Sequence, residues 1–214
     1  MKTTVKAAQL RETLKAEIAS HSVTLSKEAV DGLARYYELL NDWNSRLHLV
    51  SFRSPEEFAT RHVLESLVLL RYLPHSARVG DVGSGGGLPI IPCLIARPDL
   101  HAVLVESSKK KAVFLREVLR QIEMKERAQV IAERFENIPT SEVDFVTCRA
   151  LERFEAMLPL LIKWAPPAST MLLFGGEGLG NVIGNLGVPS ERILLPNSTG
   201  RFLFVMKQSS ASLP

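Results

Sequence analysis

The chain has 214 residues, of which 46% are hydrophobic, so it can bury a real core and is not intrinsically disordered. Its net charge of +3 permits a polyanionic partner without demanding one. Charged side chains interrupt every short apolar stretch near the N-terminus, which argues against a signal peptide or a membrane span. Cys93 and Cys148 lie far apart, without the spacing of a disulfide framework or a zinc site. We therefore expect a cytoplasmic protein that binds no metal.

The first third of the chain has helical patterns. From Lys27 to Trp43 apolar residues recur every three or four positions, which predicts a helix with one buried stripe and with Ser26 as its N-cap. A second helix is predicted to start at Ser54-Pro55-Glu56-Glu57, because serine at the cap, proline at the first helical position and glutamate three after the cap together satisfy the free amides. A nearby proline ends it at about Tyr72. We expect residues 1–75 to form an N-terminal helical extension.

Beyond this region short β-branched runs alternate with helical stretches. Strands are predicted at Arg78–Val82, Ala102–Val105, Gln129–Ile131, Val143–Val146, Thr170–Phe174, Arg192–Leu195 and Phe202–Met206. Crossover helices are predicted at Leu88–Ala96, Lys110–Ile122 and Leu151–Trp164. The alternation predicts an α/β fold with a seven-stranded, mostly parallel sheet and helices on both faces. This domain would span residues 76–208, with a frayed tail at 209–214.

A glycine-rich turn follows the first predicted strand. The segment from Asp81 to Pro89 reads Asp-Val-Gly-Ser-Gly-Gly-Gly-Leu-Pro, and its glycines let the backbone approach a ligand closely, with helix-start amides directed at it. A dinucleotide site needs Gly-x-Gly-x-x-Gly, but the third position of that pattern falls on Leu88. Gly83, Gly85 and Gly87 instead match the Gly-x-Gly-x-Gly of methyltransferases. A turn that merely redirects the chain is the structural alternative.

Glu106 ends the next strand. A carboxylate at this position can accept two hydrogen bonds from vicinal ribose hydroxyls, which adenosylmethionine and NAD both carry. Glu106 therefore predicts a bound nucleoside without deciding which one, and a solvated side chain at a strand end is the alternative. We predict cofactor contacts at Gly83, Gly85, Leu88 and Glu106.

Four stretches, HVLESLVLL, DVGSGGGLPIIPCLIARP, ERFENIP and VTCRAL, occur in this order and resemble the GidB family of small-subunit ribosomal RNA guanine-N(7) methyltransferases. The resemblance runs from about Leu33 to Lys207. It implies a Rossmann-like class I methyltransferase fold, S-adenosylmethionine as cofactor, and N(7) of a guanine in 16S ribosomal RNA as methyl acceptor. The implied partner is the small ribosomal subunit, and we expect the enzyme to be a monomer without membrane attachment.

The resemblance also implies site residues outside the glycine turn. Family positions that hold the cofactor match Gly83, Leu88, Phe135, Glu136 and Arg149. Phe135 and Glu136 follow the third strand, where adenine commonly lies, and Arg149 follows the fourth, beside the methyl group. The chain departs from the family pattern at His48-Leu49-Val50, Ile90 and Phe174-Gly175-Gly176.

Methyl transfer to guanine N(7) is an in-line displacement onto an unprotonated lone pair. No general base is obligatory, so catalysis can rest on proximity and orientation. We assign Arg149 and Arg134 as catalytic residues, because their guanidinium groups can contact phosphate or the guanine Hoogsteen edge. A solvated Arg134 is an equal alternative, and His62, on an apolar helix, is favoured as a packed residue over an RNA contact. Lys109-Lys110-Lys111 is expected to be solvated surface.

Other functions stay open. Cys148 lies where a thiolate would be the nucleophile of a cytosine carbon-5 methyltransferase, but the Pro-Cys context is missing, which favours a small space-filling side chain. A class I methyltransferase that acts on another RNA base or on a small molecule is the next alternative. A nucleotide-binding regulator without catalysis is the third. The fold alone does not choose among them.

Overall fold

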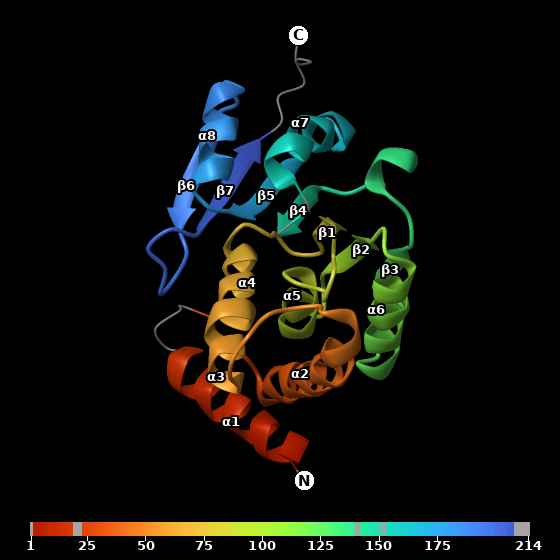
Figure 1. Cartoon of the computed structure of the whole chain (residues 1–214), viewed down its shortest axis with the longest axis vertical. Helices are drawn as coiled ribbons and strands as arrows, with labels where there is room; N and C mark the ends of the chain where they lie inside the picture. The colour runs from red at the N-terminus through yellow and green to blue at the C-terminus, as the bar shows by residue number, and fades with distance from the viewer. Residues whose placement is uncertain (1, 19–22, 140–141, 150, 152, 208–214) are drawn as a thin grey trace.

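The computed structural model describes residues 2–18, 23–139, 142–149, 151 and 153–207. Its strands are β1 (Arg78–Val82), β2 (His101–Val105), β3 (Ala128–Ile131), β4 (Phe145–Arg149), β5 (Thr170–Gly175), β6 (Ser190–Leu194) and β7 (Phe202–Lys207). They form one sheet in the order β3-β2-β1-β4-β5-β7-β6 (Figure 1). The five strands from β3 to β5 are parallel, and β7 runs antiparallel to both of its neighbours. The predicted α/β fold with a seven-stranded, mostly parallel sheet is therefore confirmed.

Both faces of this sheet are buried, because side chains alternate between them along each strand. On β5, Leu172 and Phe174 join one hydrophobic cluster, whereas Met171 and Leu173 join another. The first cluster also contains α5 (Ile90–Ala96) and α6 (Lys109–Gln121). The second contains α7 (Phe154–Trp164) and α8 (Glu177–Asn185). Helices thus cover both faces, as predicted.

The helix α8 was not predicted, because its sequence Glu-Gly-Leu-Gly-Asn-Val-Ile-Gly-Asn holds three glycines, which disfavour a helix. Leu179 and Ile183 lie four positions apart and are buried, so tertiary packing stabilises the helix despite its composition.

The predicted bounds of β4, Val143–Val146, were also wrong. The strand starts later, at Phe145, and continues to Arg149, because its last residues pair with β5.

The N-terminal region consists of α1 (Lys2–Glu17), α2 (Lys27–Leu47) and a long irregular helix. That helix joins α3 (Pro55–Glu57), the π-helical η2 (Phe58–Leu64), α4 (Glu65–Leu67) and the 3₁₀ turn η3 (Val68–Arg71). Both predicted caps are confirmed. The hydroxyl of Ser26 accepts a hydrogen bond from the Ala29 amide, and that of Ser54 accepts one from the Glu57 amide. The π-helical turn was not predicted.

These helices pack on the sheet domain and share its core. Leu10 of α1 and Leu33 of α2 belong to the same hydrophobic cluster as Ile91 of α5 and Phe114 of α6. The boundary predicted between residues 75 and 76 therefore does not separate two hydrophobic cores. The division of the chain into an N-terminal extension and a catalytic domain stays a prediction. The predicted tail at 209–214 lies outside the described residues. No helix among the described residues combines the length and the apolarity that crossing a membrane requires.

Candidate functional site

The glycine turn between β1 and α5 forms the floor of the site. Gly83, Gly85 and Gly87 all have positive φ angles, of 72°, 53° and 88°. A Cβ on Gly87 would lie 2.2 Å from Cδ1 of Ile91, and this close packing on α5 together with a φ of 88° favours glycine here. Around a Cβ on Gly85 the nearest atom would be the Gly83 carbonyl oxygen, 3.7 Å away, so Gly85 faces open space.

Backbone contacts to β2 hold this turn in place. The amides of Gly83 and Ser84 donate to the carbonyl of Val105 at 2.9 and 3.2 Å. The Gly85 amide donates to Oε2 of Glu106 at 2.8 Å, and Oε1 of Glu106 accepts from the Ser108 amide at 2.7 Å. The amides of Gly83, Ser84 and Gly85 are therefore used within the chain rather than aimed at a ligand, and α5 starts only at Ile90. Each oxygen of Glu106 keeps a second lone pair for a ligand hydroxyl.

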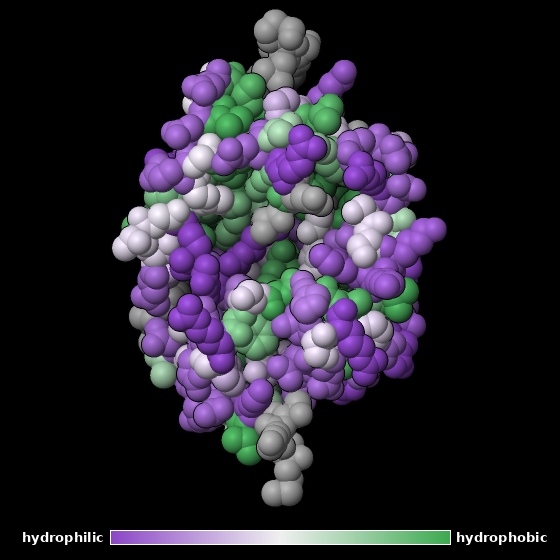
Figure 2. Space-filling model, in the orientation of Figure 1, coloured by the Kyte–Doolittle hydropathy of each residue, from purple (hydrophilic) through white to green (hydrophobic). Residues whose placement is uncertain are grey.

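A cleft of about 770 Å³ opens above this turn, at the carboxyl ends of the parallel strands. Figure 2 shows a hollow on this face of the molecule, with hydrophilic residues at its rim. The cleft brings together five of the predicted site residues: Gly83, Gly85, Leu88, Glu106 and Arg149. Its volume suits a nucleoside cofactor together with part of a second ligand.

The other three predicted residues, Arg134, Phe135 and Glu136, do not line this cleft. Phe135 is buried, with its ring centroid 5.7 Å from that of Trp164. The guanidinium of Arg134 is largely exposed and lies 3.9 Å from the carboxylate of Glu136. Their cofactor and substrate roles stay predictions.

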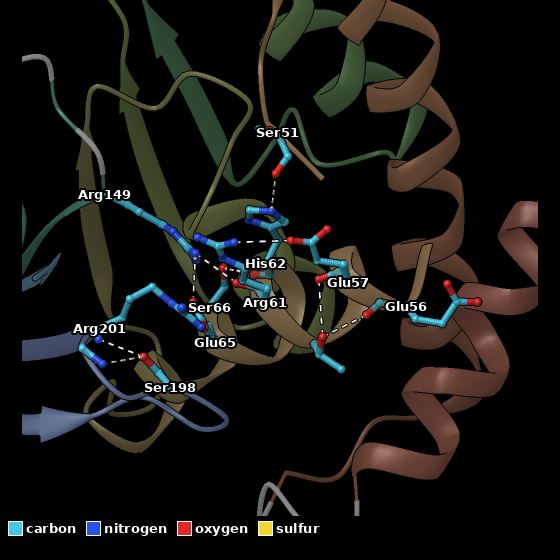
Figure 3. Close-up of polar contacts among 12 residues, drawn as sticks. Ser51, Glu56, Glu57, Arg61, His62, Glu65, Ser66, Arg149, Ser198 and Arg201 are labelled. Atoms are coloured by element: carbon cyan, nitrogen blue, oxygen red, sulfur yellow. Dashed lines mark hydrogen bonds and ion pairs between the residues drawn. The ribbon is translucent and has the colours of Figure 1, made fainter. Parts of the chain in front are cut away.

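A buried ionic network closes one side of the cleft (Figure 3). Glu65 is fully buried, and its two carboxylate oxygens pair with two arginines from distant parts of the chain. Oε2 of Glu65 accepts from Nη2 of Arg149 at 2.9 Å, and Oε1 accepts from Nη2 of Arg201 at 2.6 Å. Neither Glu65 nor Arg201 was predicted as a site residue, although a glutamate within the apolar run of HVLESLVLL was a signal of a buried charge.

The π-helical turn contributes to this network. In a regular α-helix the Arg61 carbonyl would accept a hydrogen bond from the Glu65 amide. The Glu65 amide donates to the His62 carbonyl instead, and the Arg61 carbonyl accepts from Nη2 of Arg149 at 2.9 Å. Burial lowers the pKa of Arg149, an effect that the nearby Glu65 carboxylate opposes. Arginine nevertheless stays charged, so the cleft holds a fixed cation.

His62 packs against Phe52 and Phe58, with ring centroids 6.4 and 5.5 Å away, in agreement with the packed position favoured from the sequence. Its Nε2 is 3.1 Å from the carbonyl oxygen of Ser51. Burial, reinforced by the positive charge of Arg149, lowers its pKa to about 4, so the imidazole is neutral at neutral pH. His62 also lines the cleft, which the sequence did not decide.

Two further buried groups lie beneath the turn. Cys148 is fully buried, and burial raises the pKa of its thiol well above the ordinary value, which disfavours the thiolate nucleophile considered above. Asp81 is also fully buried, and burial raises its pKa to about 8. Among the described residues no group of three or more His, Cys, Asp and Glu side chains is arranged to hold a metal ion.

The family comparison matches the larger part of the chain. The family model GidB, described as rRNA small subunit methyltransferase G, matches residues 29–181. The chain belongs to the GidB family. The resemblance noted in the sequence is thereby confirmed.

Curated relatives carry the same description. "Ribosomal RNA small subunit methyltransferase G" of Nitrosomonas eutropha is 43% identical over 129 residues, 60% of this chain and 59% of that protein. The protein of the same name from Chromobacterium violaceum is 38% identical over 148 residues, 69% of this chain and 70% of that protein. The chain thus aligns with less than two thirds of the Nitrosomonas protein.

Solved structures agree on the fold. An S-adenosyl-L-methionine-dependent methyltransferase of Methanococcus maripaludis, itself assigned only provisionally, superposes with a TM-score of 0.58 at 15% identity, over 84% of this chain and 95% of that one. An RNA methyltransferase from Salinibacter ruber, solved with S-adenosyl-L-homocysteine, gives a TM-score of 0.57 at 15% identity, over 77% of this chain and 99% of that one. These likenesses confirm the Rossmann-like class I methyltransferase fold.

Proposed function

We propose that this GidB-family chain is an S-adenosylmethionine-dependent methyltransferase that methylates N(7) of a guanine in 16S ribosomal RNA. The observation that carries the proposal is the cleft, in which the methyltransferase glycine turn and Glu106 lie on one side and the Glu65-linked arginines on the other. Family membership supports the same conclusion. The small ribosomal subunit is the proposed partner, in the cytoplasm, and the proposed enzyme is a monomer.

The residues at the turn fit S-adenosylmethionine. Gly85 leaves open space above the backbone, Leu88 lines the cleft, and Glu106 keeps lone pairs for the two ribose hydroxyls. When bound, this cofactor supplies a methyl group activated by its positively charged sulfur. Phe135 and Glu136 are proposed to contact the adenine end after a local rearrangement of η4 (Phe135–Asn137), since they lie outside the cleft.

The chain's own catalytic contribution is positioning. Because guanine N(7) already offers a lone pair, the site has only to hold the base in line, an effect worth up to about 7–11 kcal/mol. Arg149 is held by Glu65 and by the Arg61 carbonyl, so its guanidinium is a rigid contact for the acceptor. Arg134 is exposed and can reach RNA phosphate. We propose residues 1–75 as the part that orients the RNA above the catalytic domain of residues 76–208.

The test is transfer of a tritiated methyl group to small-subunit particles and to protein-free RNA, followed by nuclease mapping of the label. We expect label in one unpaired guanine of the small-subunit RNA, since N(7) lies in the deep, narrow major groove of an RNA duplex. Incorporation should be lost in Arg149→Ala and reduced in Arg134→Ala. Label only in large-subunit RNA, in another base or in a small molecule would refute the substrate.

Salt dependence gives a second criterion. If the acceptor is folded RNA, phosphate contacts supply much of the affinity, and binding should fall steeply with rising salt through counterion release. A small-molecule acceptor would show little such slope.

A further inference from the structure

Two buried polar atoms of the cleft-lining residues have no hydrogen-bond partner among the described residues. They are Nδ1 of His62 and Nη1 of Arg149. Buried polar atoms are nearly always hydrogen-bonded, so an unpartnered pair at a binding cleft calls for a ligand that supplies the missing partners. The scheme above uses the Arg149 guanidinium as a contact for the acceptor without naming the atom that makes the contact, and it gives His62 no part.

The first atom is an acceptor. A carbonyl oxygen can only accept, so Nε2 of His62 carries the proton that it donates to Ser51. In a neutral imidazole the other nitrogen then holds a lone pair. Nδ1 of His62 is therefore a hydrogen-bond acceptor for which the described residues provide no donor.

The second atom is a donor. Nη2 of Arg149 is already occupied by Glu65 and by the Arg61 carbonyl (Figure 3). Nη1 carries two further N–H groups and accepts nothing. Because Glu65 and the Arg61 carbonyl fix the guanidinium, Arg149 offers a hydrogen-bond donor of fixed direction at Nη1.

We propose that His62 and Arg149 together recognise the target purine as guanine, with His62 Nδ1 accepting from guanine N1–H and Arg149 Nη1 donating to guanine O6. This inference rests on the proposed function, which supplies guanine as the acceptor. On guanine the O6 acceptor and the N1–H donor are adjacent, whereas adenine carries a donor at the amino group and an acceptor at N1. Adenine would therefore place donor against donor and acceptor against acceptor, which excludes it.

The same contact favours the reaction itself. The N(7) lone pair forms the new N–C bond while the carbon–sulfur bond breaks and its electron pair stays on sulfur. The purine thereby becomes positively charged, and its N1–H becomes a stronger donor. The hydrogen bond to His62 is thus stronger in the transition state than in the bound substrate, so its loss should lower kcat as well as kcat/KM.

Two substitutions separate this role from a structural one. The oxygen of Asn occupies the position of Nδ1, so His62→Asn keeps the acceptor and loses the hydrogen bond to Ser51. The amide nitrogen of Gln occupies the position of Nε2, so His62→Gln keeps the bond to Ser51 and loses the acceptor. We expect His62→Gln to lower kcat/KM for small-subunit RNA about 10-fold or more, with His62→Asn close to wild type.

The matched control is His75→Gln, which makes the same change at an exposed histidine that does not line the cleft. The dissociation constant for S-adenosylhomocysteine should be unchanged in all three variants. Full activity of His62→Gln, or a loss confined to His62→Asn, would overturn the inference in favour of a structural role. No guanine methylation by the wild-type protein would instead refute the proposed function.

A second measurement leaves the protein unchanged and varies the RNA at the mapped nucleotide. Inosine keeps O6 and N1–H and should be methylated at a rate near that of guanosine. 1-Methylguanosine lacks the N1 proton and should lose about 10-fold or more in kcat/KM. Methylation of 1-methylguanosine as fast as guanosine would overturn the role of His62.

Discussion

Single residues at the carboxyl ends of β1 and β2 determine how the turn is built. Gly85 combines a positive φ with open space above it, and Glu106 fastens the turn through its carboxylate. Asp81, the residue before the last in β1, carries a carboxyl whose two oxygens have no hydrogen-bond partner among the described residues. Each of these three features leads to a measurement.

Replacing Gly85 by valine should remove cofactor binding. A branched side chain would project into the cleft and would strain a backbone whose φ is 53°. Isothermal titration with S-adenosylmethionine, its demethylated product and NAD would measure this, with circular dichroism as a check on the fold. Binding of NAD but not S-adenosylmethionine to the wild-type chain would contradict the assignment of the turn.

Glu106→Ala should weaken cofactor binding, because charge-assisted hydrogen bonds to ribose are lost, each worth about 1.5–3 kcal/mol. The alanine also frees the Gly85 amide, so Glu106→Gln serves as a control that keeps an acceptor near the turn. An unchanged dissociation constant in Glu106→Ala would exclude a ribose role.

Asp81 predicts a pH dependence of stability. Burial raises its pKa from the ordinary 3.8 to about 8, so between these values the folded chain holds a proton that the unfolded chain has lost. Stability from this group is therefore present at low pH and lost as pH rises towards 8. Urea unfolding gives the free energy of unfolding of the wild type and of Asp81→Asn at about pH 5 and about pH 9. We expect the wild-type value, relative to that of Asp81→Asn, to be lower at the higher pH. An equal difference at both pH values would contradict the raised pKa.

Among the elements, α8 and the helix that runs from α3 to η3 differ most from sequence expectation. In α8 packing overrides three glycines, and in η2 a π-helical turn redirects the Arg61 carbonyl to Arg149. Neither feature follows from local propensity, because both depend on residues that contact the element from elsewhere in the chain.

The glycines of α8 give a matched pair of substitutions. A Cβ on Gly184 meets nothing within 4 Å, so Gly184→Ala should stabilise the chain by about 0.5–1 kcal/mol through helix propensity. A Cβ on Gly180 would lie 3.1 Å from the buried Phe204 ring, so Gly180→Ala should gain less or lose stability. Thermal and urea unfolding measure both, and equal gains would contradict the packing of α8 on β7.

At the scale of the whole molecule, the N-terminal helices contact the glycine turn directly. The hydroxyl of Tyr36 in α2 is buried and donates to the carbonyl of Gly86 at 2.6 Å. A Cβ on Gly86 would lie 2.8 Å from Cγ2 of Val50, so the segment after α2 also packs on the turn. The N-terminal helices therefore support the glycine turn of the proposed cofactor site.

Tyr36→Phe should raise the dissociation constant for S-adenosylhomocysteine, because the Gly86 carbonyl loses its partner and the turn is less well held. We also expect a loss of about 1–3 kcal/mol in the free energy of unfolding. Tyr37→Phe removes a hydroxyl from the same helix, where the ring packs on Phe52 and Phe58 instead, and should leave cofactor affinity unchanged. Equal affinities for wild type and Tyr36→Phe would show that the contact is only structural.

Local patterns along the sequence were sufficient for the existence and order of the strands, though not for the bounds of β4, and for both helix caps, the glycine turn, the position of Glu106 beside it and the family. These features depend on neighbouring residues, through side-chain alternation, capping hydrogen bonds and glycine's freedom at positive φ. Which polar side chains pair with one another at the cleft was decided only by the tertiary structure. Glu65 and Arg201 are 136 residues apart in sequence, and no local pattern encodes which of several arginines a buried carboxylate will meet. The same holds for His62, whose free nitrogen becomes meaningful only once folding has brought it to the cleft with Arg149.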